Sequence, residues 1–168
     1  MMRFESERGT SLVETVIAMG ILLVVMVGLL GMAGLATVYT ENHGHLEART
    51  TEYAQDKMEQ LLALAYTDAV TNTVVFPAAT SGGTGLAVGG GTNTAAPVAG
   101  YVDWLAYDGS LLGGGTAAPT TWFYERVWLI DSVSSGMKQI TVVTTVRNSV
   151  GRALVPKSTV VMQKTSRF

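Results

Sequence analysis

Apolar residues are unevenly placed along the chain, and the longest apolar run lies near its beginning. From Thr15 to Thr40, 26 residues carry no charge, and Glu14 and Glu41 flank them. As a helix this run would extend about 39 Å, which is enough to cross a bilayer. It is too long for the apolar core of an ordinary secretory signal, and no small-residue cleavage site follows it. The pattern therefore predicts a membrane-spanning helix that stays in the working protein.

After residue 40 the pattern changes to that of an amphipathic helix. Over residues 41–66 an apolar stripe recurs at helical spacing, and the charged residues are expected to face elsewhere. The stripe consists of Ala54, Met58, Leu61, Leu62 and Ala65, and the charged residues are Glu47, Arg49, Glu52, Asp56, Lys57 and Glu59. We expect the stripe to pack on a globular head, so that one long helix has a transmembrane half and an amphipathic half.

Glycines interrupt both halves of this predicted helix. Gly28, Gly31 and Gly34 recur at three-residue spacing, which favours close helix packing in lipid; the alternative is a weak spot that melts or bends. Further on, Gly44 separates His43 from His45. We interpret the histidines as solvated residues at a helix irregularity and predict no metal site there.

The middle of the chain has the composition of a long loop region. Between Pro77 and Pro119 there are 11 glycines and three prolines, and Asp103 and Asp108 are the only charged residues. No glycine-rich phosphate-binding motif occurs in it. The aromatic segment from Tyr101 to Tyr107 is expected to form a short strand or a patch that caps the core.

The last third of the chain has the alternation of β-strands. Strands are predicted over 122–131, 139–147 and 158–165, with turns at 134–136 and 148–151. Three consecutive strands joined by polar turns suggest an antiparallel meander that packs on the amphipathic helix. The predicted fold class is therefore α+β, a long N-terminal helix on a C-terminal antiparallel sheet.

Composition and charge exclude several classes of protein chemistry. Only 14% of residues are charged, the net charge is −2 and there is no cysteine, which excludes disulfides, thiolate metal sites and cysteine catalysis. We find no catalytic constellation, so we predict no enzymatic activity, no cofactor and no bound metal.

Charge is segregated between the two ends of the predicted head. Residues 41–68 contain six acids and two bases, whereas residues 132–168 contain six bases and no acid. We favour attraction between helix and sheet, or between adjacent subunits, over an anionic partner such as DNA or lipid headgroups, because the bases are scattered. We expect no nucleic-acid partner.

A short polar leader, MMRFESERG, precedes the apolar run and contains Arg3 and Arg8, whereas the far side has few basic residues before Arg49. This difference favours a cytoplasmic leader and an extracytoplasmic head. Glu14 lies at the head of the run, where an ionised carboxylate is costly unless it is paired. One explanation is a helix cap, because Ser11 and Glu14 match the spacing of a capping box. The other explanation is a partner on a neighbouring molecule.

The leader ending in Arg8-Gly9, the segment Thr10-Ser11-Leu12-Val13-Glu14 and the unbroken apolar helix together resemble the class III signal of type IV pilins and type II secretion pseudopilins. By this resemblance, prepilin peptidase cuts between Gly9 and Thr10, Thr10 becomes the N-methylated first residue, and Glu14 is the assembly glutamate. The segment from Ala54 to Leu64 and the strands around residues 124–142 are similar to PilV-type minor pilins and minor pseudopilins.

The resemblance implies a pilin-like subunit of the bacterial inner membrane that primes or caps a type IV pilus or a type II secretion pseudopilus. Its expected partners are prepilin peptidase, other pilins or pseudopilins and the assembly platform protein. The alternatives are a major pilin, and an unprocessed single-pass membrane protein that presents a β-rich binding head. The expected parts are a leader (1–9), a transmembrane and assembly helix (10–40), an amphipathic spine (41–68), a glycine-rich loop region (69–120) and an antiparallel β head (121–168).

Overall fold

The computed structural model describes residues 12–147 and 155–166 and divides the chain into two compact units, residues 1–42 and 43–168. One helix, α1 (Leu12–Ala63), contributes to both units. The strands are β1 (Gly89–Gly90), β2 (Val102–Leu105), β3 (Leu111–Gly114), β4 (Tyr124–Ser134), β5 (Met137–Val146) and β6 (Lys157–Thr165). All of them belong to the second unit, which we call the head.

The described part of the first unit is the apolar half of α1. Its large apolar side chains, from Leu12 to Tyr39, are all exposed, and it is long and apolar enough to cross a membrane. Its threonines bond within the helix: the hydroxyls of Thr15, Thr37 and Thr40 donate to backbone carbonyls three or four residues earlier, at 2.8–3.0 Å. These hydroxyls therefore need no water, which suits an apolar environment.

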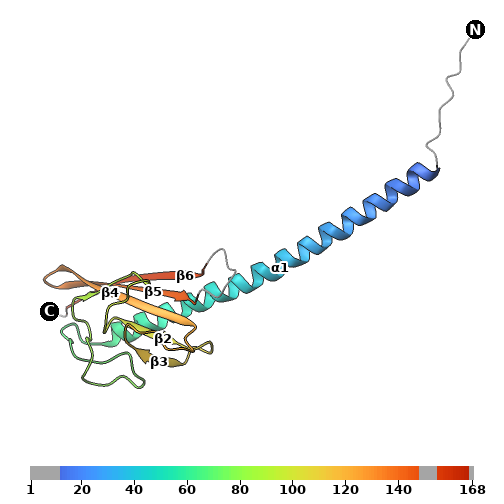
Figure 1. Ribbon diagram of the computed structural model, residues 1–168. Helices are drawn as coiled ribbons and strands as arrows, with labels where there is room; N and C mark the ends of the chain where they lie inside the picture. Colours follow the sequence, from blue (N-terminus) through green and yellow to red (C-terminus); the bar gives the residue numbers. More distant parts are fainter. Residues whose placement is uncertain (1–11, 148–154, 167–168) are drawn as a thin grey trace, which may run out of the picture. The chain divides into compact units, whose positions relative to one another are not determined.

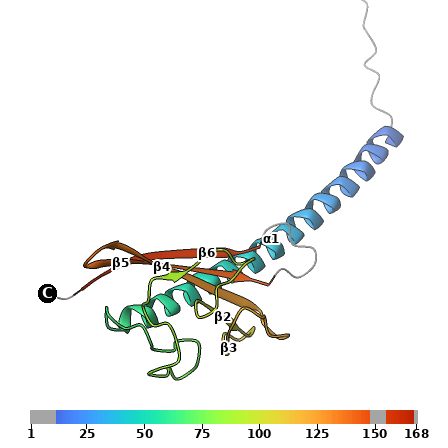
Figure 2. The same cartoon turned by 60° about the vertical axis from the view of Figure 1, so that its left-hand side comes forward.

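The head is built on one antiparallel sheet, in which the strand order is β3-β2-β4-β5-β6 and β1 pairs with β4. The second half of α1 lies along one face of this sheet (Figure 1 and Figure 2). The strands predicted over 122–131, 139–147 and 158–165 are β4, β5 and β6, and the predicted meander is confirmed. The predicted turn at 148–151 lies outside the described residues. The coarse α+β layout, a long helix packed on an antiparallel sheet, is thereby confirmed.

The main core forms between α1 and the sheet. The helix contributes Ala54, Met58 and Leu61, and every second residue of the central strands faces them, among them Trp128 and Ile130 of β4. A smaller cluster joins Tyr53 to Leu105, Tyr124 and Val146. The predicted apolar stripe is therefore the buried face at Ala54, Met58 and Leu61, whereas Ala65 follows the last helical residue, Ala63.

The opposite face of the sheet carries a second apolar cluster. Val102, Trp104, Val127 and Val143 are buried there, and Trp122 packs edge-on against Trp104 at a ring distance of 5.0 Å. The indole N–H of Trp104 donates to the carbonyl of Gly115 at 2.8 Å, so that the glycine-rich segment after β3 lies over this face. Both faces of the central strands are thus covered.

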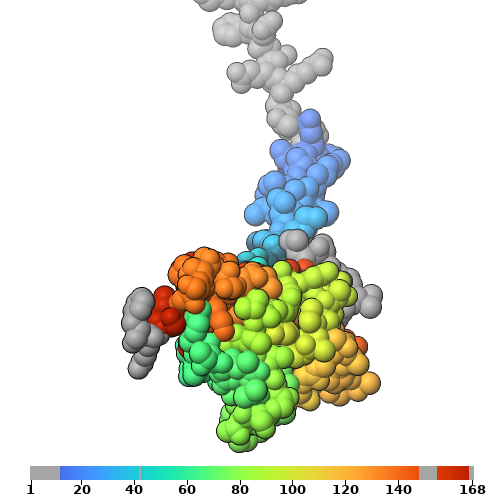
Figure 3. All heavy atoms as spheres, turned by 90° about the vertical axis from the view of Figure 1, so that its left-hand side faces the viewer, coloured from blue at the N-terminus to red at the C-terminus, as the bar shows by residue number. Residues whose placement is uncertain are grey.

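The loops after α1 are ordered by specific contacts rather than by regular structure. They form much of the surface at the end of the head where α1 finishes (Figure 3). Asp68 accepts hydrogen bonds from the backbone N–H groups of Val70 and Thr71, and from the hydroxyl of Thr71. The region 69–120 is therefore not loop alone, since it also supplies β1, β2 and β3.

Two lysines of the sheet donate to backbone carbonyls near the end of α1: Lys164 contacts the last turn, and Lys138 contacts the loops after it. Lys164 donates to the carbonyls of Leu62 and Leu64, and Lys138 donates to the carbonyls of Tyr66 and Leu86 at 2.8 and 2.7 Å. Cations are favourable at this end of a helix, where carbonyls lack partners and the dipole is negative. These contacts are made to backbone carbonyls and not to the acids of residues 41–68, so the predicted attraction between acidic spine and basic sheet stays a prediction.

One expectation about α1 is wrong. The helix runs through Gly44 without the predicted irregularity. A single glycine costs only about 1 kcal/mol relative to alanine, which the neighbouring turns of a long helix can absorb. His43 and His45 accordingly lie within regular helix.

Candidate functional site

The predicted processing and assembly residues lie at the start of the chain, where the structure describes only part of them. Gly9, Thr10 and Ser11 fall outside the described residues, so neither the cleavage site nor the capping box can be placed. Glu14 lies in the first turn of α1 and is exposed. It forms no ion pair with any residue that the structure describes.

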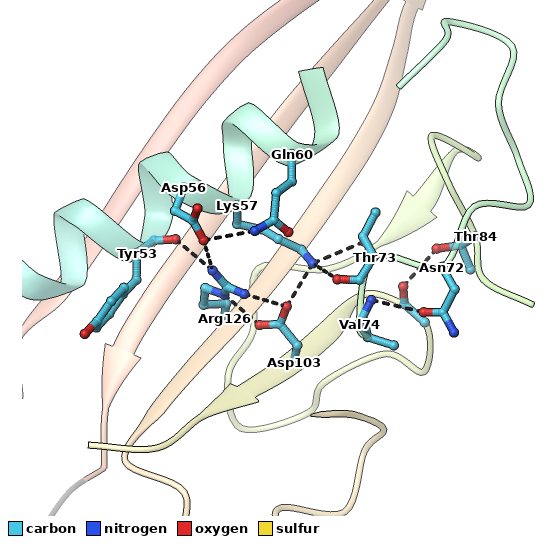
Figure 4. A network of polar contacts seen from close by, with 11 residues as sticks. Tyr53, Asp56, Lys57, Gln60, Asn72, Thr73, Val74, Thr84, Asp103 and Arg126 are labelled. Carbon is cyan, nitrogen blue, oxygen red and sulfur yellow. Dashed lines mark hydrogen bonds and ion pairs between the residues drawn. The ribbon is translucent and has the colours of Figure 1, made fainter. Parts of the chain in front are cut away.

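The structure brings together a second group of charged residues, inside the head (Figure 4). Lys57 of α1, Asp103 of β2 and Arg126 of β4 are almost completely buried and lie in contact. Arg126 holds Asp103 with two parallel hydrogen bonds, from Nε to Oδ1 at 2.7 Å and from Nη2 to Oδ2 at 2.9 Å. The Nζ of Lys57 lies 2.8 Å from Oδ2 of the same carboxylate. We call these three residues the buried charge cluster.

Each of the three ammonium protons of Lys57 has an acceptor in this cluster. Besides Asp103, its Nζ donates to the carbonyl of Thr73 at 2.7 Å and to the Thr73 hydroxyl at 3.1 Å. It also lies 4.2 Å from the centre of the Trp128 ring. Three acceptors match the three protons of an ammonium group, so the geometry is that of charged Lys57.

Burial and charge act in opposite directions on the cluster. Burial lowers the pKa of Lys57, and nearby Asp103 offsets this only in part. Burial also acts to raise the pKa of Asp103, but Lys57 and Arg126 outweigh it, so this pKa is lowered and the carboxylate stays ionised. An ion pair of this kind repays its loss of hydration only when its geometry and hydrogen bonding are good.

The burial of Lys57 corrects the sequence-based prediction that this residue faces away from the core. Its position contained a usable signal, because Lys57 lies three residues after Ala54 and four before Leu61, on the edge of the apolar stripe. The spacing could not reveal the partners, since Asp103 and Arg126 come from strands far along the chain. Asp103 itself was expected in the loop region, with no role assigned to it.

Beside the cluster, a groove of about 610 Å³ opens to the surface. Helix α1 supplies Asp56 and Gln60, the loop after it supplies Val75 and Phe76, and Arg126 reaches the groove from β4. The Asp56 side chain is half exposed, and its Oδ2 accepts from Arg126 Nη1 at 2.9 Å and from Gln60 Nε2 at 3.0 Å. The groove therefore has a polar floor connected to the buried charge cluster, and an apolar wall.

This arrangement holds three segments of the head together. The charged groups of the cluster are paired with one another and with backbone carbonyls, so they fix α1, the loop at Thr73 and the sheet in one arrangement. In the described part of the chain, no three metal-binding side chains lie close enough to share an ion. His43 and His45 thus belong to no such group.

Compared with known proteins, the chain matches no family model, no curated protein and no solved structure. The class that the fold itself defines is an α+β head carried on a helix whose other half is apolar and exposed.

Proposed function

We propose that the chain is a minor pilin or minor pseudopilin, a structural subunit that primes or caps assembly of a type IV pilus or a type II secretion pseudopilus. The observation that carries the proposal is the apolar half of α1, whose large side chains are all exposed and whose first turn contains Glu14. An apolar helix of this length needs lipid or the helices of other subunits around it.

In this proposal the leader is removed between Gly9 and Thr10, and Thr10 is N-methylated. Cleavage leaves a positive amine near the apolar run, and the carboxylate of Glu14 on a neighbouring subunit neutralises it. Because an unpaired charge is expensive in an apolar environment, this pairing sets the register between subunits. Glu14 is then an assembly residue and not a catalytic one.

The cellular setting follows from the same proposal. The subunit waits in the bacterial inner membrane with its leader in the cytoplasm and its head outside, until the assembly platform protein moves its helix into the filament. The head, fixed to α1 by the main core and the buried charge cluster, presents the surface that selects other pilins or pseudopilins.

The test is an intact mass with N-terminal sequencing of the full chain, extracted from cells that produce an active prepilin peptidase. A chain that begins at N-methylated Thr10 is expected, and Gly9→Val should block processing while membrane insertion is kept. A control variant, Gly20→Val, changes a glycine inside the apolar run and should be processed normally. A chain that still begins at Met1 or Met2 beside an active peptidase would refute the proposal.

The groove at Asp56 favours a second candidate, an unprocessed membrane-anchored protein whose head binds a partner. Here Glu14 is only a helix cap. This candidate predicts that the original chain and Gly9→Val both still begin at Met1 or Met2, and that the substitution leaves partner binding by the head unchanged. A filament-assembly defect in Gly9→Val would exclude it.

A further inference from the structure

The groove has an apolar lip that faces water. Phe76 is 89% exposed and its neighbour Val75 is 40% exposed, and both line the groove. Single exposed apolar residues are ordinary, but here a large aromatic ring adjoins a hollow of about 610 Å³ with a half-exposed carboxylate in it. That combination of an apolar contact and a directed polar group is typical of binding sites.

The groove can bind a positively charged group. Arg126 Nη1 and Gln60 Nε2 both donate to Oδ2 of Asp56, and no described residue donates to Oδ1. The buried charge cluster contains two positive charges and one negative charge, and Asp56 supplies the second negative charge, so that Oδ1 of Asp56 is a free acceptor beside a neutral set of four residues. Exposed Glu59 lies three residues after Asp56 on the same face of α1 and forms no ion pair with any residue that the structure describes, so this face has a surplus of negative charge. A cationic group is therefore the favoured occupant.

A matching surface lies at the other edge of the sheet. The groove adjoins the hairpin of β2 and β3, whereas β6 is the edge strand on the far side of the strand order. Lys157, the first residue of β6, is exposed, and Thr159 and half-exposed Val161 follow it on the same strand face. Among the described bases, Arg49 pairs with Glu52 and Arg147 donates to two carbonyls, which leaves Lys157 as the exposed base without such a partner.

We propose that the groove at Asp56 and Phe76 of one copy receives the Lys157 edge of β6 from a second copy. The ammonium group of Lys157 meets Oδ1 of Asp56, and the apolar face at Val161 packs against Phe76. This inference deepens the proposed function, on which it rests for bringing copies side by side. It adds the surfaces and the direction of the contact.

Two properties of the contact follow from its geometry. The two surfaces are different and lie at opposite edges of one sheet, so the contact is head-to-tail and leaves a free groove and a free β6 at each end of a row. A groove of this size seats part of one strand, which is well below a standard stable interface. The contact is therefore weak in dilute micelles and becomes occupied when copies are concentrated in a membrane.

The absence of native cysteine allows a clean crosslinking test with the full chain in membrane vesicles. Ala78→Cys places a thiol in the groove, and Thr159→Cys places one on the exposed face of β6 and keeps Lys157. We expect a disulfide-linked dimer when the two variants are produced together, at least about five times more than from either alone. Dimers from Thr159→Cys alone would mean that β6 pairs with β6, and would overturn the proposal, as would no dimer in any sample.

Charge variants in the mixed sample test the chemistry. Lys157→Glu and Gln60→Lys should each lower the crosslinked fraction about fivefold, because a salt bridge at such a surface is worth up to about that factor. Combining the two substitutions should restore the crosslinked fraction. Lys157→Arg and the matched control Arg49→Gln should leave it unchanged. Crosslinking that ignores all of these charges would overturn the proposal.

The failure of this contact can be told from the failure of the proposed function. If the chain is cut after Gly9 but the mixed variants give no dimer, the contact is wrong and the function stands. If the dimer forms with the expected charge dependence while the chain keeps its leader, the contact stands and the filament role fails.

Discussion

Glu125 provides the sharpest test of how the head is stabilised. It lies on β4 between Trp104 of β2 and Thr145 of β5, on the sheet face away from α1. Only 3% of it is exposed, and its Oε1 has no hydrogen-bond partner among the described residues. Burial raises the pKa of Glu125 from its usual 4.5 to about 7. A carboxyl group that loses water without gaining a donor favours its protonated form.

The magnitude follows from the difference between the folded and unfolded pKa. A pKa of about 7 against 4.5 corresponds to about 3 kcal/mol, an upper value because the surroundings can relax. Between these two values the folded chain holds the proton more tightly than the unfolded chain, so the free energy of unfolding falls as pH rises. The stabilisation is fully present below pH 4.5 and is lost by the time pH has passed 7.

We therefore expect Glu125→Gln to remove this pH dependence. At pH 8 the variant should unfold with a free energy up to about 3 kcal/mol higher than the original chain, and near pH 4.5 the two should be alike within about 1 kcal/mol. Comparing the two chains at each pH cancels the contributions of all other titrating groups.

The assay is urea unfolding of the full chain in detergent micelles, followed by tryptophan fluorescence from pH 4.5 to pH 8. All three tryptophans lie in the head, at positions 104, 122 and 128, so the signal reports on the head alone. Glu52→Gln, at an exposed acid on α1, is the matched control and should leave the pH dependence unchanged. Parallel stability curves for the original chain and Glu125→Gln would refute the reasoning.

The remaining predictions concern the buried charge cluster and one close backbone approach. Asp103→Asn leaves Lys57 facing Arg126 without the carboxylate between them, so it should lower the free energy of unfolding by about 3–5 kcal/mol in the same assay. The control Asp108→Asn changes an aspartate in an exposed turn and should lower it by less than about 1 kcal/mol. Gly90→Ala should destabilise the head by about 1–3 kcal/mol, because φ is +88° and the new Cβ would come 2.2 Å from the Trp128 carbonyl. Gly113→Ala should cost less, because Gly113 also has a positive φ, +120°, but open space around the new Cβ. Equal losses from the two alanine variants would show that close approach contributes nothing.

The parts of the fold that the sequence predicted are those governed by local periodicity. Alternation located β4, β5 and β6, and helical spacing placed Ala54, Met58 and Leu61 on the buried face. The aromatic segment from Tyr101 to Tyr107 was expected to be a strand or a cap on the core, and it contains β2. In each of these cases the residues that decide the structure are close together in the chain.

What the sequence could not predict depends on contacts between distant residues. Lys57 and Asp103 are 46 positions apart, and the sequence around either residue does not indicate that the two form an ion pair. From the sequence alone, Glu125 cannot be distinguished from an exposed polar residue of a strand. Its burial results from its neighbours on β2 and β5 and from the segment after β3, which lies over that face. The groove is formed by four separate segments, which are α1, the loop after it, the hairpin of β2 and β3, and β4, so no local sequence pattern indicates it.

The buried charge cluster and the groove share Arg126, which makes stability and docking separable by experiment. Arg126 binds Asp103 through Nε and Nη2 and holds Asp56 through Nη1, so the cluster fixes the carboxylate that the groove offers. A variant that breaks the cluster, such as Asp103→Asn, should therefore weaken both the folded head and the crosslink from Ala78→Cys to Thr159→Cys. Lys157→Glu lies at the opposite edge of the sheet and should lower the crosslinked fraction about fivefold while the free energy of unfolding stays within about 0.5 kcal/mol. A Lys157→Glu chain that unfolds as easily as Asp103→Asn would mean that the crosslink reports only on folding, and the docking contact would lose its support.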